Sequence, residues 1–230
     1  MPDQTPDDAQ PLLLPLPPVV WALLLALGAV ELALWAGAQG LIGGAQAPGW
    51  RLLAVERFGF AAPVQHWMVE TRQFLPEHLL RYLTYPLIHA SPAHAALSAV
   101  LLAALGKFIA RHHGQGALAL LLTLPGALGA SAFAALTDGS GWLLGATPAA
   151  LALVGAWTLT QWQAAPTPRA RIAALGLIGS FILARLALGL LVETAATWIA
   201  DLTAFATGVL LAAALTPGTL RRTLARLRQR

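Results

Sequence analysis

The sequence predicts an all-α, polytopic membrane bundle of six transmembrane helices, and three observations support this fold class. The 230 residues are 57% hydrophobic but only 10% charged, whereas about a quarter of the residues in a soluble domain are charged. The apolar residues form long runs composed mostly of Leu and Ala, which favours helices that cross lipid. The alternating pattern of a membrane β-barrel, in segments of about ten residues, is absent from the sequence.

Six apolar runs are long enough to span a bilayer. Each contains about 18–23 residues, and a helix of that length crosses a hydrocarbon layer of ~30 Å at about 1.5 Å per residue. The predicted spans are residues 19–41, 93–110, 116–136, 146–163, 171–192 and 196–215.

The remaining segments define the domain organisation. Residues 1–18 contain three Asp and no Lys or Arg, so they lack the basic start of a signal peptide, and we expect a disordered acidic leader. Residues 19–215 form the predicted membrane domain, and residues 216–230 form a basic tail. Within the domain, residues 43–91 make a long outer loop with aromatic and charged residues. We expect this loop to lie in the membrane interface as short amphipathic pieces.

Basic residues give the predicted orientation. Lys107 and Arg111 lie at the link that joins the second and third spans, Arg169 and Arg171 lie at the link that joins the fourth and fifth, and the tail follows the sixth. All three places fall on one side of a six-helix bundle, and Lys and Arg favour the cytoplasm. We therefore expect both termini in the cytoplasm and the chain in a bacterial-type inner membrane. The same topology accounts for the net charge of +4, so nucleic-acid binding is not expected.

A polar motif leads into the second predicted span. It reads RYLTYPLIHASPAHAALS, from Arg81 to Ser98. It resembles the rhomboid intramembrane serine proteases, in which R-Y-x-T-x-x-x-x-H-x-S-x-x-H-x-x-x-N opens the second core helix. Two further pieces follow in the family's order: GATPA at residues 145–149, where the family has G-x-S-G, and ADLTAFATG at residues 200–208, where the family has A-H-x-x-G-x-x-x-G. The resemblance covers roughly residues 19–215.

The resemblance implies a serine endopeptidase, yet this sequence departs from the family at the reactive positions. Thr147 stands at the position of the nucleophilic serine, Asp201 at that of the histidine base, and Ser98 at that of the oxyanion asparagine. His94 matches the family at the other oxyanion position. Among residues expected to shape the recess, the motif supplies Arg81 and His89, the latter as a structural hydrogen-bonding group.

The substitutions weaken the expected chemistry. Peptide cleavage needs a nucleophile, a base that activates it and donors for the oxyanion. The branched side chain of Thr147 crowds an attack, and a carboxyl group with an ordinary pKa of about 4 is a poor base. Thr147 followed by Pro148 is also typical of a helix start. We expect the Thr147 hydroxyl to cap that helix rather than react.

Charged residues within the predicted spans need partners. A carboxylate at the centre of a membrane helix costs about 2.5–3.5 kcal/mol, and such groups usually face the interior and are paired. Asp201 and Arg185 lie at similar predicted depths, so we hypothesise an ion pair between them. The alternative for Arg185 is a side chain that reaches the outer headgroups. For Glu31 we weigh a proton or ion pathway against protonation or a local hydrogen bond, and we expect the latter.

Small residues predict how the last span packs. Ala200, Ala204, Gly208 and Ala212 recur every four residues and form one smooth stripe. The fourth span carries a shorter version at Ala152 and Ala156. Close packing of these two helices would bring Thr147 near Asp201.

Three functional hypotheses follow. The first is a rhomboid-like pseudoprotease that binds transmembrane segments of client proteins without cutting them. The second is an active rhomboid-type serine endopeptidase, which family resemblance implies. The third is a small transporter that uses Glu31, Arg185 and Asp201, although it lacks the paired discontinuous helices of many transporters. The expected partners are membrane lipids and client transmembrane segments. No cofactor or metal site is expected, and the absence of Cys excludes thiolate ligands and disulfides.

Overall fold

The computed structural model describes residues 16–137, 141–191 and 196–216, with side chains for all of these except 185–191. The basic tail beyond residue 216 and the acidic leader up to residue 15 lie outside the described residues. The long helices are α1 (Pro18–Ala38), α5 (Pro92–Leu136), α6 (Thr147–Ala164), α8 (Gly176–Leu191) and α9 (Trp198–Leu215). The shorter elements are η1 (Gly44–Gly49), α2 (Trp50–Phe58), β1 (Phe60–Ala61), α3 (Ala62–Thr71), α4 (Pro76–Thr84), η2 (Tyr85–Leu87), β2 (Trp142–Leu143) and α7 (Pro168–Ala174).

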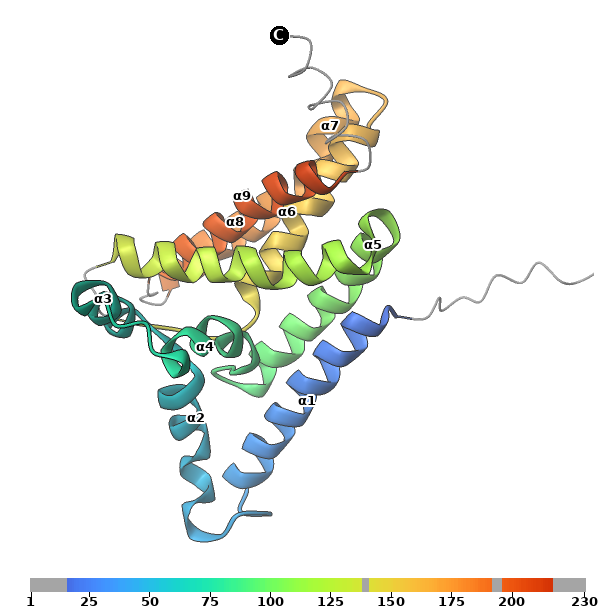
Figure 1. Cartoon of the computed structure of the whole chain (residues 1–230). Helices are drawn as coiled ribbons and strands as arrows, with labels where there is room; N and C mark the ends of the chain where they lie inside the picture. The colour runs from blue at the N-terminus through green and yellow to red at the C-terminus, as the bar shows by residue number, and fades with distance from the viewer. Residues whose placement is uncertain (1–15, 138–140, 192–195, 217–230) are drawn as a thin grey trace, which may run out of the picture.

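The predicted helical membrane bundle is confirmed. Three of the described helices, α1, α5 and α9, are long and apolar enough to cross a membrane. The second and third predicted spans are the two arms of α5, which runs alongside α1 and then bends sharply (Figure 1). The bend lies at Gly114, whose φ of +84° suits a residue without a Cβ.

The fifth predicted span differs from the sequence-based expectation. It is divided into α7 and α8, with a break at Leu175 between them. Thr167 starts α7 by accepting a hydrogen bond from the Ala170 N–H at 3.2 Å, so the helix begins before the predicted residue 171. The chain thus turns at this end through a short, capped helix rather than entering one continuous span.

The core is built from α5, α6 and α9, each of which packs against the other two. A Cβ added at Gly155 of α6 would overlap the Phe205 carbonyl oxygen of α9. A Cβ at Gly208 of α9 would likewise overlap the Ala152 carbonyl oxygen of α6. The two backbones are therefore in direct contact, and the predicted stripe is confirmed. Its members are all buried: Ala200, Ala204, Gly208 and Ala212.

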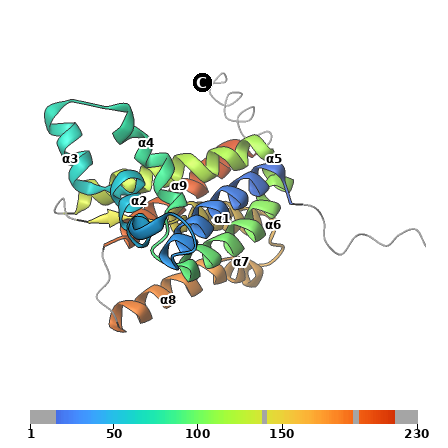
Figure 2. The ribbon, with the colours of Figure 1, turned by 90° about the horizontal axis from the view of Figure 1, so that it is seen from below.

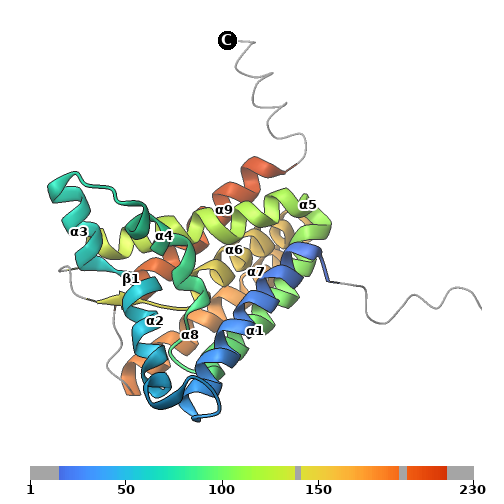
Figure 3. The ribbon, with the colours of Figure 1, turned by 60° about the horizontal axis from the view of Figure 1, so that its bottom comes forward.

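The outer loop is folded into short helices that lie beside the long ones (Figures 2 and 3). Strand β1 of this loop pairs antiparallel with β2, so that Phe60 faces Leu143 and Ala61 faces Trp142. Because β2 lies four residues before α6, this pairing ties the outer loop to the segment that leads into Thr147.

Candidate functional site

Thr147 is the first residue of α6, and a sharp turn at Gly145 precedes it. Gly145 has a φ of +84° and donates its N–H to the Tyr85 carbonyl at 3.1 Å. The N-cap of α6 is Ala146, and no side chain accepts a capping hydrogen bond there. The prediction that Thr147 caps this helix is therefore wrong. The turn at Gly145 shifts the helix start by one residue, so the Thr147 hydroxyl is directed elsewhere.

The Thr147 hydroxyl instead contacts His94. Its Oγ1 lies 3.1 Å from Nε2 of His94, which projects from the first turn of α5. That turn is well defined, because Ser91 caps it by accepting the His94 N–H at 3.2 Å. The S-x-x-H spacing of the motif thus has a local cause: the serine fixes the backbone of the histidine three residues later.

His89 supports the turn that carries Thr147. It is 0% exposed, and its Nε2 accepts the Ala146 N–H at 3.2 Å. The His89 and His94 rings meet edge to face with centroids 4.9 Å apart. Burial, with the nearby His94 adding to it, lowers the pKa of His89 to about 4. His89 is therefore neutral at pH 7, with its acceptor nitrogen committed to the backbone.

Gly145 is required where these groups meet. A Cβ at this position would lie 2.6 Å from Cε1 of His94 and 3.1 Å from Cδ2 of His89. The two histidines and the Gly145 backbone therefore leave no room for a side chain, whatever its backbone conformation.

A recess of about 500 Å³ collects the residues that match the family's reactive positions. His94 and Ser98 come from α5, Thr147 from the start of α6, and Asp201 from α9. Apolar residues complete the lining, among them Phe181 and Ala184 of α8. The packing of α6 against α9 thus brings Thr147 and Asp201 to one cavity, as the small-residue pattern predicts.

Asp201 is 1% exposed and lies in the first turn of α9. Its charge raises the pKa of the buried Tyr85 hydroxyl, beyond the larger rise that burial causes. Tyr85 donates its hydroxyl to the Gly126 carbonyl at 3.0 Å, which ties the outer segment to α5. The hypothesised partner of Asp201, the Arg185 side chain, lies outside the described residues.

Glu31 has a partner that the sequence did not reveal. Arg51, at the start of α2, contacts both carboxylate oxygens, with Nη2 2.5 Å from Oε1 and Nη1 3.2 Å from Oε2. The local interaction expected for Glu31 is thus an ion pair. The general need for a partner was the available signal, but nothing in the spacing distinguished Arg51 from the other basic residues of the outer loop.

Arg81 acts within the outer loop. It lies in α4 and donates Nη1 to the Gly59 carbonyl at 2.9 Å, while burial lowers the pKa of its guanidinium. Gly59 directly precedes β1, so this hydrogen bond connects α4 to the β1–β2 pairing, and Arg81 itself does not line the recess.

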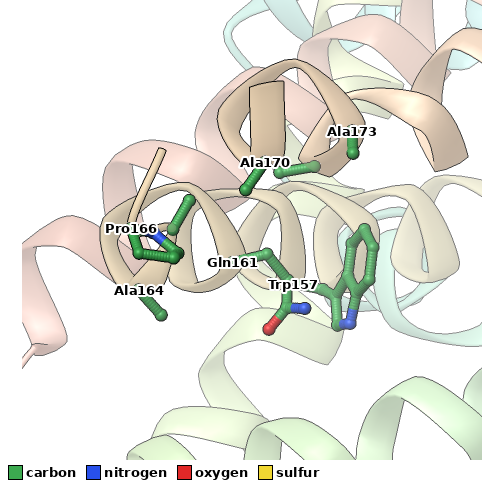
Figure 4. A pocket seen from close by; sticks show the side chains of 8 residues that line it. Trp157, Gln161, Ala164, Pro166, Ala170 and Ala173 are labelled. Atoms are coloured by element: carbon green, nitrogen blue, oxygen red, sulfur yellow. The ribbon is translucent and has the colours of Figure 1, made fainter. Parts of the chain in front are cut away.

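Two other possibilities are less suited to chemistry. Among the described residues, no cluster of three or more His, Cys, Asp or Glu side chains is placed to hold a metal ion. A second cavity, of about 320 Å³, lies between α6 and α7. Alanines form most of its lining, together with Trp157, Gln161 and Pro166 (Figure 4), and none of these side chains is titratable.

Comparison with known proteins identifies the family of this chain. The rhomboid domain family matches residues 76–218, which is more than half of the chain and includes all four residues that share the recess. Among curated proteins, none matches this chain. The Glu31–Arg51 ion pair lies before the matched region. The chain belongs to the rhomboid family and is a helical membrane protein of that family.

Proposed function

We propose that this chain is a catalytically inactive rhomboid that binds transmembrane segments of client membrane proteins. Rhomboid family proteins act on membrane-protein substrates within the bilayer. The recess supports a binding role, because apolar side chains of α5 and α8, such as Leu97, Leu101 and Phe181, line it beside the polar groups. An apolar helix can pack on such walls while its backbone approaches the polar floor.

The identity of residue 201 carries the proposal of inactivity. Asp201 occupies the position of the family's histidine base, and an ionised carboxylate near neutral pH accepts protons weakly. The residue after Thr147 is Pro148, which has no N–H to offer a developing oxyanion. Thr147, Asp201 and Ser98 thus stand at the positions of the nucleophile, the base and the oxyanion asparagine, while the helices that hold these positions are present.

We further propose a location in the inner membrane with both termini in the cytoplasm. His113, beside the α5 bend, lies 3.2 Å from Thr160 near the far end of α6. The basic residues around the bend and in α7 therefore share the end of the bundle opposite Thr147. Positive charge at that end supports a cytoplasmic placement.

A cleavage assay in lipid vesicles tests the proposal. Wild type, Thr147→Ala and the control Thr207→Ala are each reconstituted with a fluorescent single-span substrate. Thr207 donates its hydroxyl to the Thr203 carbonyl within α9 at 2.7 Å. Thr207→Ala therefore makes the same chemical change as Thr147→Ala, but outside the recess. We expect background product from all three and saturable binding of the uncut segment. The double variant Thr147→Ser, Asp201→His should gain cleavage if the frame is intact.

The 3.1 Å contact between Thr147 and His94 favours a second candidate, a threonine-dependent endopeptidase. In this scheme Nε2 of His94 takes the hydroxyl proton as Oγ1 attacks the peptide carbonyl, and later returns it to the leaving amine. Product above background from wild type and Thr207→Ala, with loss in both Thr147→Ala and His94→Gln, would establish this activity and refute inactivity.

The transporter hypothesis loses its main support. Arg51 neutralises Glu31, so the first span no longer presents a lone carboxylate to an ion pathway. Proteoliposomes that show no ion-dependent flux would discard it.

A further inference from the structure

Glu31 and Arg51 form an ion pair that lies outside the region that matches the family. Glu31 is 9% exposed and lies in the middle of α1, and Arg51 lies at the start of α2. Both carboxylate oxygens accept from the guanidinium, at 2.5 and 3.2 Å. Two contacts of this kind fix the plane of the guanidinium as well as its position.

The oriented guanidinium reaches a third acceptor. Nη1 of Arg51 also donates to the carbonyl oxygen of His89 at 2.6 Å. A lysine would keep the charge but not the planar fork, so it could not serve the carboxylate and the carbonyl with one geometry. The main chain of His89 is thus held from the α1–α2 side by Arg51.

The side chain of His89 connects its main chain to the turn that precedes Thr147. Its Nε2 accepts the N–H of Ala146, the residue directly before Thr147. Gly145 is packed against His89 and His94 without space for a methyl group. A shift of His89 would therefore displace the Ala146 amide or lengthen the hydrogen bond between them.

We infer that Glu31 and Arg51 are positioning residues, which fix His89 and thereby the Ala146–Thr147 turn at the floor of the recess. Their effect on clients rests on the proposed binding function, but their effect on the turn can be measured without a client. The inference thus extends the site to α1 and α2, which precede the family match.

Two variants separate the geometry of Arg51 from its charge. Arg51→Lys retains the charge but loses the fork, and Glu31→Gln with Arg51→Gln removes both charges, so that no unpaired ion is buried. Arg57→Lys is the matched control, because Arg57 lies over the Phe58 ring at 5.7 Å in the same helix. Each protein, uniformly labelled, is studied in lipid nanodiscs by ¹⁵N NMR of the histidine rings and by amide exchange.

In wild type and Arg57→Lys we expect His89 to stay neutral down to a pH of about 4. In Arg51→Lys and in the double variant, its titration should move toward the ordinary value of about 6.5. The groups facing His89 that affect it are His94, Glu31 and Arg51 itself, and Arg51→Lys leaves all three charges in place. Exchange of the Ala146 amide should accelerate about tenfold, as expected when one hydrogen bond to a fixed acceptor is lost.

Unchanged His89 titration and Ala146 exchange in both folded variants would overturn the inference. Should Arg51→Lys fail to fold, the charge-free double variant alone decides the matter, and its fold is checked by its unaltered His112 and His66 signals. Binding of a fluorescent single-span peptide is measured in parallel. Absence of binding to wild type would count against the proposed function, whereas altered histidine signals would still support the positioning role.

Discussion

At each end of the bundle a threonine of α6 lies next to a histidine of α5, but the two threonine hydroxyls differ in their hydrogen bonds. At the recess, Thr147 of α6 lies 3.1 Å from His94 of α5. At the opposite end, Thr160 of α6 lies 3.2 Å from His113 of α5. Thr160 donates its hydroxyl proton to the Ala156 carbonyl of its own helix at 2.8 Å. Thr147 is the first residue of α6, so the helix offers it no carbonyl four residues back.

The difference shows that helix position, rather than residue type, makes a hydroxyl available. A mid-helix threonine bonds to its own backbone and serves packing. A threonine at the first turn, such as Thr147, has no such carbonyl of its own helix to receive its hydroxyl proton. The recess end also has Gly145 with φ +84°, and the other end has Gly114 with the same φ. Their surroundings differ, so the two glycines can be compared in matched tests.

The largest expected effect comes from filling the space at Gly145. Both Gly145→Ala and Gly114→Ala place a Cβ on backbone with φ +84°, which costs about 1 kcal/mol or more. At Gly145 the new Cβ also strikes His94, whereas nothing lies within 4 Å at Gly114. We therefore expect Gly145→Ala to lower the free energy of unfolding by about 2–3 kcal/mol more than Gly114→Ala.

Thermal unfolding in detergent measures this difference. Equal decreases in the free energy of unfolding for the two glycine substitutions would show that the histidine side chains move to accommodate the new Cβ. The recess end would then be packed no more closely than the bend.

The next effect concerns pH and is expected at the recess end. The pKa of His89 is lowered to about 4 in the folded chain, and an unfolded histidine titrates near ~6.5. Between these values the unfolded chain binds the extra proton. Stability is therefore highest above pH ~6.5 and falls as the pH approaches about 4, by on the order of 3 kcal/mol.

Unfolding measured from pH 7 to 4 should show this slope in wild type and in His112→Gln, whose ring is exposed. His89→Gln removes the titrating group and should flatten the curve while lowering stability at pH 7. An equally steep slope in His89→Gln would assign the pH dependence to other groups.

The smallest effect distinguishes the two threonines directly. Thr160→Val removes a hydroxyl that serves packing, so we expect a loss of about 1 kcal/mol in stability and unchanged client binding. Thr147→Val keeps the shape at the recess floor but removes its polar contact with His94. We expect little change in stability and about a fivefold change in affinity for a single-span peptide.

Peptide titration in nanodiscs, paired with unfolding curves, checks both parts. If Thr160→Val altered binding as strongly as Thr147→Val, the comparison between the two ends would fail.

Much of the fold was predictable because the bilayer imposes simple patterns. Apolar runs located the helices, and the four-residue stripe placed α9 against α6. The start of α7 and the α7–α8 break were not predicted, because local capping by Thr167 decides where α7 starts. The sequence predicts two spans where the structure has the single helix α5, and these two spans correspond to the two arms of that helix.

The site was predictable only in part. The motif spacing located His94, Ser98, Thr147 and Asp201, which line one recess. The capping role expected for Thr147 was wrong, because the φ of Gly145, and not the Thr-Pro pair, sets the helix start. The Arg51 contact was missed since it depends on how the outer loop folds back onto α1. Long-range contacts of this kind leave no periodic trace in a sequence.

The backbone contact between α6 and α9 has a consequence for the side chains that these two helices carry. Gly155 and Gly208 let main chain meet main chain, so no side-chain rotamer intervenes in the spacing of these helices. The side chains of residues 147 and 201 take no part in this backbone contact. We therefore expect substitutions at residues 147 and 201 to leave the spacing of α6 and α9 unchanged.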